Sequence, residues 1–327
     1  MRALPFCFTL RTTATVILWA LAGIACAQFP ERSVRILVPA TTGTAIDILA
    51  RTLADGLQPG WGRPIVVENR LGGNGIVAAQ ALAGSAADGH TLMVHPAGTV
   101  SFHPALYENL PYDPLRDFAP ISQLAALAVW ILADPKLEAR TVPELVALAR
   151  KQPGKLSYTT SGGTSGLPYI ASVLVQNLTA MDVAFIPYSN QTQALTDVMG
   201  GRVQFMFIPV PSSIGLVRAG KLRVLAVLSQ RRLAQDAEVP TIAEAGLPEA
   251  TGEAWNGLSG RAGTPVAVVK RIRDDAVALL KRPETAARLN KLGFEVIGNT
   301  PEEFTNVIRT EQAKWGKVIR DNRIRAE

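Results

Sequence analysis

The sequence predicts an α/β fold of two lobes, in which mainly parallel sheets are covered by helices. From Val34 onward, short apolar runs alternate with segments whose apolar residues recur at helical spacing. This alternation is typical of parallel sheets with helices on their faces. The chain has 327 residues, which is enough for two lobes with separate cores.

The predicted strands and helix starts follow in order along the chain. The strand runs are VRILV, PIVVEN, TLMVHP, KLSYTT, VAFIPY, VQFMFIPV and LRVLAVL. After the first run, one helix face is predicted from Ile46, Leu49, Ala50, Leu53 and Leu57. Capping boxes are predicted at TVPE, residues 141–144, and TPEE, residues 300–303, and the second predicts a long helix over residues 300–324.

Two segments are expected to cross between the lobes. Residues 119–133, APISQLAALAVWILA, lack the Gly-rich turn that follows other strands. A second crossing is expected near residues 230–246, because the C-terminal helices must return to complete the first lobe. We therefore predict that residues 28–125 and 246–327 form lobe 1 and that residues 126–245 form lobe 2.

Residues 1–27 have the pattern of a secretory signal peptide. Arg2 and Arg11 precede an apolar stretch at residues 14–24 that is too short to span a bilayer, and Ala-Cys-Ala precedes Gln28. We expect cleavage before Gln28 and an exported, soluble protein; a lipid anchor at Cys26 is the alternative. The only other cysteine is Cys7, so the mature chain offers neither a disulfide nor a thiolate metal site.

The net charge of the chain indicates which classes of partner are expected. The formal net charge is +6, spread along the sequence without a basic stripe and interleaved aromatics. Nucleic acid is therefore not an expected partner. Steering of small anionic ligands is the most that this charge supports.

Two strand-to-helix turns carry most of the functional information. They are PATTGTAID, residues 39–47, and YTTSGGTSGLP, residues 158–168, and neither contains Lys, Arg, His or Cys. Each exposes N–H groups and hydroxyls at a helix N-terminus, where the helix dipole favours an anion. Since ligands bind at this edge of open α/β sheets, the pair predicts a carboxylate site built from neutral donors. The alternative is that both turns are ordinary helix caps.

The sequence supports three other kinds of site less well than a carboxylate site. GNGIVA, residues 73–78, matches a dinucleotide fingerprint, but the next strand offers no carboxylate for a ribose, which favours a packing turn. His90, His95 and His103 do not share one helical face, so no metal is predicted. Leu167 breaks the G-x-S-x-G pattern around Ser165, and an exported hydrolase that uses Ser165 stays as an alternative.

The chain resembles the Bug family, the substrate-binding proteins of tripartite tricarboxylate transporters, over nearly all of its mature length. The matching segments include PERSVRILVPATTGTAID, IVVENRLGGNGIVAAQALAGSAADGHTL, HPALYENLPYDPLRDFAPIS, KLSYTTSGGTSG, FIPYSNQTQALTDVMGGRVQFMF, AGKLRVLAVLSQRR, VPTIAEAGLP and GRAGTP. The resemblance implies a type II periplasmic binding protein, or Venus flytrap, whose two Rossmann-like lobes close about a hinge.

The same resemblance implies a function. The protein is expected in the periplasm, as a monomer without a cofactor or enzymatic activity, where it captures a small organic carboxylate and delivers it to integral membrane permease subunits. A sensor that contacts a signalling receptor is the alternative. The ligand-binding residues implied by position are Ala40, Thr41, Thr42, Gly43, Thr44, Asp47, Ala97, Gly98, Thr99, Ser161, Gly162, Gly163, Thr164, Ser165, Tyr188 and Ile208.

Differences from the family pattern indicate which chemical class of ligand the protein binds. Ala40 replaces an aromatic residue and Thr44 a glycine, while Ser189-Asn190-Gln191 stands where the family often has Lys-Gly-Gly. Ile208-Pro209 replaces a frequent acidic residue, which disfavours an amino acid and favours a carboxylate without an amino group. The space at Ala40 favours a bulkier acid, such as an aromatic one.

Overall fold

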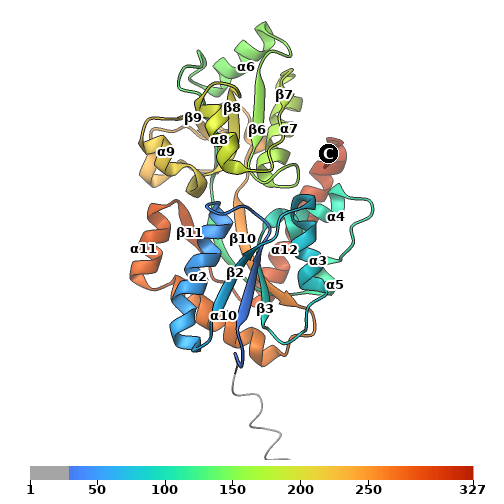
Figure 1. The fold of residues 1–327 in the computed structure, drawn as a ribbon. Coiled ribbons are helices and arrows are strands. Elements are labelled where there is room, and N and C mark those ends of the chain that lie inside the picture. The colour runs from blue at the N-terminus through green and yellow to red at the C-terminus, as the bar shows by residue number, and fades with distance from the viewer. Residues whose placement is uncertain (1–28, 327) are drawn as a thin grey trace, which may run out of the picture.

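The computed structural model of the protein describes residues 29–326, which form two α/β lobes (Figure 1). The first lobe contains strands β1 (Val34–Val38), β2 (Ile65–Asn69), β3 (Thr91–Pro96), β4 (Phe118–Leu127), β10 (Ala254–Arg261) and β11 (Phe294–Val296). They form one sheet in the order β11-β4-β10-β3-β1-β2. The predicted α/β, two-lobed fold class is confirmed.

The second lobe contains the other sheet. Its strands are β5 (Val129–Ala133), β6 (Ser157–Thr160), β7 (Ala184–Phe185), β8 (Phe205–Pro209) and β9 (Arg223–Val227), in the order β7-β6-β8-β5-β9. Every strand run predicted from the sequence corresponds to one of these strands or to β1, β2 or β3 of the first lobe.

Both sheets are mixed: most strands of each run in one direction, and the antiparallel strands among them are a feature that the sequence pattern did not predict. The pairs β1–β2, β1–β3, β6–β7 and β6–β8 are parallel. However, β10 runs antiparallel to β3 and β4, and β5 runs antiparallel to β8 and β9. The reason is that β5 and β10 each enter a sheet from the other lobe, at the edge where the parallel strands end. The apolar runs alone do not carry this information.

Helices cover the two sheets (Figure 1). In the first lobe these are α2 (Ala45–Trp61), α3 (Ile76–Ala83), α4 (His103–Leu106), α5 (Pro114–Asp117), α10 (Val266–Leu280), α11 (Pro283–Lys291) and α12 (Pro301–Asp321). In the second they are α6 (Val142–Lys151), α7 (Leu167–Thr179), α8 (Gln191–Met199) and α9 (Ile214–Arg218). Short helical turns add η1 (Gly73–Gly75), η2 (Gly98–Phe102), η3 (Val210–Ser212), η4 (Ala234–Asp236) and η5 (Pro248–Ala250).

Local sequence signals set the ends and buried faces of these helices. At the start of α12, Thr300 Oγ1 accepts from Glu303 N at 3.2 Å, and the Glu303 carboxylate accepts from Thr300 N at 2.8 Å, so the predicted capping box is present. The predicted apolar face of α2 is buried against the first sheet, with Leu49, Ala50 and Leu53 fully inaccessible. Among residues 29–326, no helix is long and apolar enough to cross a membrane.

The chain passes between the lobes where β4 gives way to β5, with only Ala128 between them, and again between β9 and β10. The strands of the first sheet therefore fall within residues 34–127 and 254–296, and those of the second within residues 129–227. The lobe boundaries at residues 125 and 245 stay a prediction, as does hinge motion about the crossings. The predicted signal peptide, its cleavage site and Cys26 lie outside the described residues.

Candidate functional site

A cavity of about 530 Å³ lies between the two lobes, at the ends of their parallel strands. The ends of β1, β2 and β3 and the turns that follow them supply residues 39–41, 44–46, 71–75 and 96–98 of its wall. The second lobe supplies residues 160–163 and 165–168 at the end of β6 and beyond it, residues 188, 189 and 191 after β7, and Pro209 and Ser212 at the end of β8 and beyond it. This is the edge of an α/β sheet at which ligands are expected. Its volume lies within the range of small-molecule sites.

Most of the residues predicted to bind ligand line this cavity. Those in the wall are Ala40, Thr41, Thr44, Ala97, Gly98, Ser161, Gly162, Gly163, Ser165 and Tyr188. The predicted residues outside the wall are Thr42, Gly43, Asp47, Thr99, Thr164 and Ile208. Ile208 is fully buried in the apolar core of the second lobe, and its neighbour Pro209 faces the cavity instead, because successive side chains in a strand alternate.

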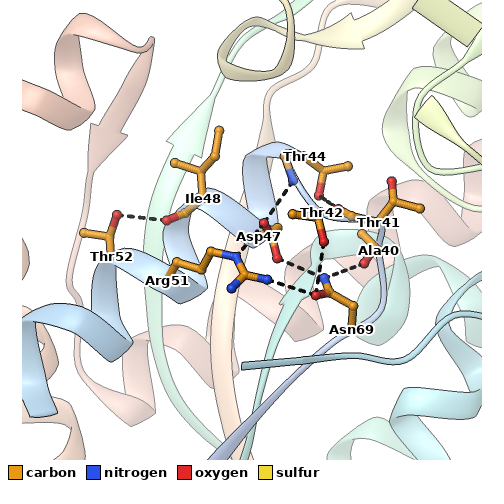
Figure 2. A network of polar contacts seen from close by, with 10 residues as sticks. Ala40, Thr41, Thr42, Thr44, Asp47, Ile48, Arg51, Thr52 and Asn69 are labelled. Carbon is orange, nitrogen blue, oxygen red and sulfur yellow. Dashed lines mark hydrogen bonds and ion pairs between the residues drawn. The ribbon is translucent and has the colours of Figure 1, made fainter. Parts of the chain in front are cut away.

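Asp47 does not line the cavity; it stabilises the first loop by hydrogen bonds from the side of the loop away from the cavity. Figure 2 shows its carboxylate among the residues that it holds. The carboxylate accepts from the Gly43 N–H, Arg51 Nε and Asn69 Nδ2, each at 2.9 Å. Asn69 Nδ2 also donates to the Ala40 carbonyl at 2.8 Å, which fixes the other end of the loop. Burial would raise the pKa of Asp47, but these hydrogen bonds and the Arg51 charge outweigh it and lower the pKa below its ordinary value.

The first loop has fewer open donors than the sequence suggested. The Gly43 N–H is bound to Asp47, and the Thr44 N–H faces the Thr41 carbonyl at 3.4 Å. The Ala45 N–H, the first of α2, donates to Ser212 Oγ of the second lobe at 3.0 Å. The expectation that this loop offers uncommitted N–H groups is therefore wrong for these three, since the Asp47 carboxylate, the Thr41 carbonyl and the Ser212 hydroxyl accept from them.

The second loop keeps open donors. Helix α7 has Gly166 as its N-cap, without a side-chain cap, and Pro168 at its second position has no N–H. Within residues 29–326, the N–H groups of Gly162, Gly166 and Leu167 make no hydrogen bond to another residue. All three residues line the cavity. The beginning of α7 is thus the strongest anion-binding element in the wall.

The lobes touch each other beside this loop. Asn74 Nδ2 donates to Tyr107 OH in its own lobe at 2.8 Å and to Thr164 Oγ1 in the other lobe at 3.0 Å. Ser165 Oγ donates to the Asn74 carbonyl at 3.4 Å. A Cβ on Gly98 would lie 2.2 Å from the Ser165 carbonyl oxygen, so glycine allows the two backbones to meet. The two lobes are therefore in direct contact beside the cavity.

Several residues of the wall were not predicted from the sequence, chiefly Asn74, Gln191, Ser212, Trp255 and Asn256. Asn74 lies in the turn favoured there as a packing turn, and its left-handed φ of 54° is a conformation that Asn adopts more readily than most residues. An Asn between two glycines is the signal that could have marked it. Trp255 and Asn256 lie on the crossing strand β10, which carries no motif.

The wall is electrically neutral. Among the described residues that line it, none is Asp, Glu, Lys, Arg or His. An anion bound there would be held by N–H groups, hydroxyls and helix dipoles. An ammonium group would find no carboxylate in the wall.

The alternative chemistries find no support in the geometry. His95 is buried with Nε2 2.9 Å from Ser259 Oγ, and burial lowers its pKa to about 4 despite a hydrogen bond with the Pro96 carbonyl. His103 shares a hydrogen bond of 2.6 Å with Tyr112 OH, and burial lowers its pKa to about 3. Among residues 29–326 no His, Cys, Asp and Glu cluster could hold a metal, and no histidine hydrogen-bonds Ser165.

Comparison with known proteins places the chain in a family. The model of the tripartite tricarboxylate transporter family receptor matches residues 49–324. Protein BugT of Bordetella pertussis is 29% identical over 307 residues, which cover 92% of this chain and 94% of BugT.

Solved structures agree with this match. Rpa4515 of R. palustris with adipate is 30% identical, with a TM-score of 0.87, and the alignment covers 91% of this chain and 99% of that one. MatC from Rhodopseudomonas palustris with bound malate is 29% identical, with a TM-score of 0.84 and coverage of 89% and 100%. The chain therefore belongs to the tripartite tricarboxylate transporter receptor family, as the Bug resemblance predicted, and is a periplasmic solute-binding protein rather than an enzyme.

Proposed function

We propose that the protein captures a small organic carboxylate between its lobes, as a monomer, and delivers it to integral membrane permease subunits of the tripartite tricarboxylate type. The observation that carries this proposal is the uncapped start of α7 in a neutral cavity between the lobes. The binding of adipate by Rpa4515 and of malate by MatC supports it, since both are carboxylates bound by similar chains.

In this proposal the carboxylate lies against the N–H groups of Gly162, Gly166 and Leu167. Hydrogen bonds to a charged group are worth about 1.5–3 kcal/mol each, and a helix N-terminus adds about 0.3–1 kcal/mol. Thr41 lines the same cavity and offers a hydroxyl. Bridging waters would connect the carboxylate to groups farther away.

The body of the ligand would face a largely apolar wall. Ala40, Ile46, Leu127 and Leu167 contribute to it. Because no acidic side chain lines the cavity, we propose a carboxylate without an amino group. Ala40 is only partly buried and leaves room for a bulkier acid, including an aromatic one.

A bound acid should stabilise the protein without being consumed. At 100 times its dissociation constant, a ligand that binds only the folded form adds about 2.7 kcal/mol to the free energy of unfolding. With about 2.1 cal/mol/K of unfolding entropy per residue, that corresponds to a rise in Tm of about 4 °C for a chain of this size. A thermal-shift screen of mono-, di- and tricarboxylates measures it, with hexylamine as the control for hexanoate. Solution scattering should show a smaller radius of gyration with the stabilising acid.

Stabilisation by hexylamine as large as that by any acid would contradict the carboxylate site. Steady conversion of the acid to a product would favour the exported hydrolase. Delivery is tested separately, because cells that lack the gene should lose uptake of the same acid. A lost transcriptional response with unchanged uptake would favour the sensor.

Replacing Thr164 with valine should weaken binding modestly. Thr164 Oγ1 accepts from Asn74 Nδ2 of the other lobe, and valine keeps the shape but removes the acceptor. Because a neutral hydrogen bond contributes about 0.5–1.5 kcal/mol, the dissociation constant should rise about 2- to 12-fold. Calorimetry with the best acid of the screen measures this. Thr196→Val, on the exposed face of α8, is the control, and equal affinities in the two variants would show that the contact does not support closure.

A further inference from the structure

Asn256 is a buried amide in the cavity wall whose Nδ2 donor is unused among the described residues. The residue is 3% exposed, and within residues 29–326 its Nδ2 has no hydrogen-bond partner. The other two amide side chains of the wall are both engaged. Asn74 donates to Tyr107 and Thr164, and Gln191 accepts from Ser161 at 2.5 Å. A buried donor left unpaired costs about 1–3 kcal/mol, so Asn256 calls for an explanation.

The backbone holds Asn256 rigidly at this place. Strand β10 lies between β3 and β4, and Asn256 pairs with Pro96 on one side and Ala125 on the other. The register between β10 and β4 shifts immediately after it, between Asn256 and Gly257. Such bulges re-aim side chains and are common beside functional sites. The amide therefore keeps its place in the wall of the cavity.

The surroundings of Asn256 define the group that it could bind. Ile46, Leu127 and Ala254 belong to the same wall, and no charged side chain does. An amide offers both donors and an acceptor but no charge. Its natural partner is a neutral oxygen, either a hydroxyl or a keto group. A plain hydrocarbon body would leave the amide unpaired.

We infer that Asn256 binds a hydroxyl or keto oxygen on the body of the ligand and makes the protein selective for hydroxy- or oxo-carboxylates over the parent acids. This inference rests on the proposed function, because it assumes that the carboxylate of the same molecule lies at the start of α7. Asn256 thus acts as a specificity residue, while the α7 loop supplies affinity for the acid group. A site built to bind an oxygen rejects a ligand that lacks it, since its own polar group is then buried without a partner.

Matched pairs of acids test this selectivity by calorimetry. The pairs are malate with succinate and 4-hydroxybenzoate with benzoate, each differing by one hydroxyl. The wild type should bind the hydroxylated member of at least one pair about tenfold more tightly or better. Asn256→Leu should bind both members of that pair within about twofold of each other, through loss of affinity for the hydroxylated acid. Asn177→Leu, at an exposed amide of α7, should keep the wild-type preference.

The melting temperature of the free protein separates a binding role from a structural one. Leucine removes an unpaired buried amide, so Asn256→Leu should melt no lower than the wild type. If the leucine variant does not fold, Asn256→Ala takes its place in the binding measurements. A preference that persists in the folded variants, or a wild type that binds carboxylates without any preference, overturns the inference but leaves the proposed function intact. If none of the four acids nor any acid of the screen binds, the proposed function fails and the inference with it.

Discussion

Replacing Gly98 with alanine should prevent the lobes from closing and weaken carboxylate binding by about 100-fold. An added Cβ would lie 2.2 Å from the carbonyl oxygen of Ser165, which is backbone of the other lobe and cannot rotate away. Gly98 begins η2 within its own lobe, and a Cβ there would have its nearest contacts with Ser165 and Gly166 of the second lobe. The clash therefore destabilises the closed state but leaves the fold of each lobe unchanged. A destabilisation of the closed state by about 2.8 kcal/mol corresponds to the 100-fold loss of affinity.

Calorimetry and solution scattering with the same acid measure this effect. Gly215→Ala is the matched control, because a Cβ on that helical glycine of α9 meets nothing within 4 Å. Gly98→Ala should melt like the wild type when free and show no ligand-induced decrease in radius of gyration. Wild-type affinity with normal compaction would mean that the lobes do not meet at Gly98.

Replacing Asp47 with alanine should lower the free energy of unfolding by about 3 kcal/mol. Asp47 is 1% exposed, and its removal takes away the acceptor of the Gly43 N–H and one of the two acceptors of Asn69 Nδ2. A hydrogen bond to a charged group contributes about 1.5–3 kcal/mol, and the exposure of Gly43 favours the low end for each, whereas the ion pair with the half-exposed Arg51 adds little. Urea unfolding measures the difference, and Asp55→Ala, on the exposed side of the same helix, should change stability by less than about 0.5 kcal/mol.

The contribution of Asp47 should depend on pH. The pKa of Asp47 is lowered in the folded protein, so its stabilising effect is complete above the ordinary pKa of an aspartate. The effect is lost as the pH falls through the lowered folded-state pKa. The stability difference between wild type and Asp47→Ala should therefore be constant near neutral pH and shrink in acid. A difference that grows in acid would contradict the hydrogen-bonding role.

The sequence predicted the fold class and the edge at which the cavity lies. Local signals suffice for this, since the runs that became strands are separated by turns with clear helix starts. The mixed sheet direction was missed, because the placement of β5 and β10 depends on the path between lobes rather than on local pattern. The prediction for α12 was confirmed at its start because its capping box is entirely local.

The details of the site depended on contacts that the sequence does not reveal. The Ala45 N–H is taken by Ser212, which is 167 residues away, and Asp47 supports the first loop from behind. Asn74 and Asn256 also depend on long-range contacts, since Asn74 meets Thr164 of the other lobe and Asn256 lies on β10 between β3 and β4. The open N–H groups of the second loop could be predicted, because they follow from glycines and a proline at a helix start, and their role in binding stays a prediction.

A crystal structure of the protein with the acid that stabilises it most is the most direct test of the central claim. The account predicts closed lobes and a ligand carboxylate whose oxygens lie about 2.7–3.1 Å from N–H groups among Gly162, Gly166 and Leu167. A carboxylate bound on the outer surface would contradict it. So would an acid in the cavity whose carboxylate points away from the start of α7.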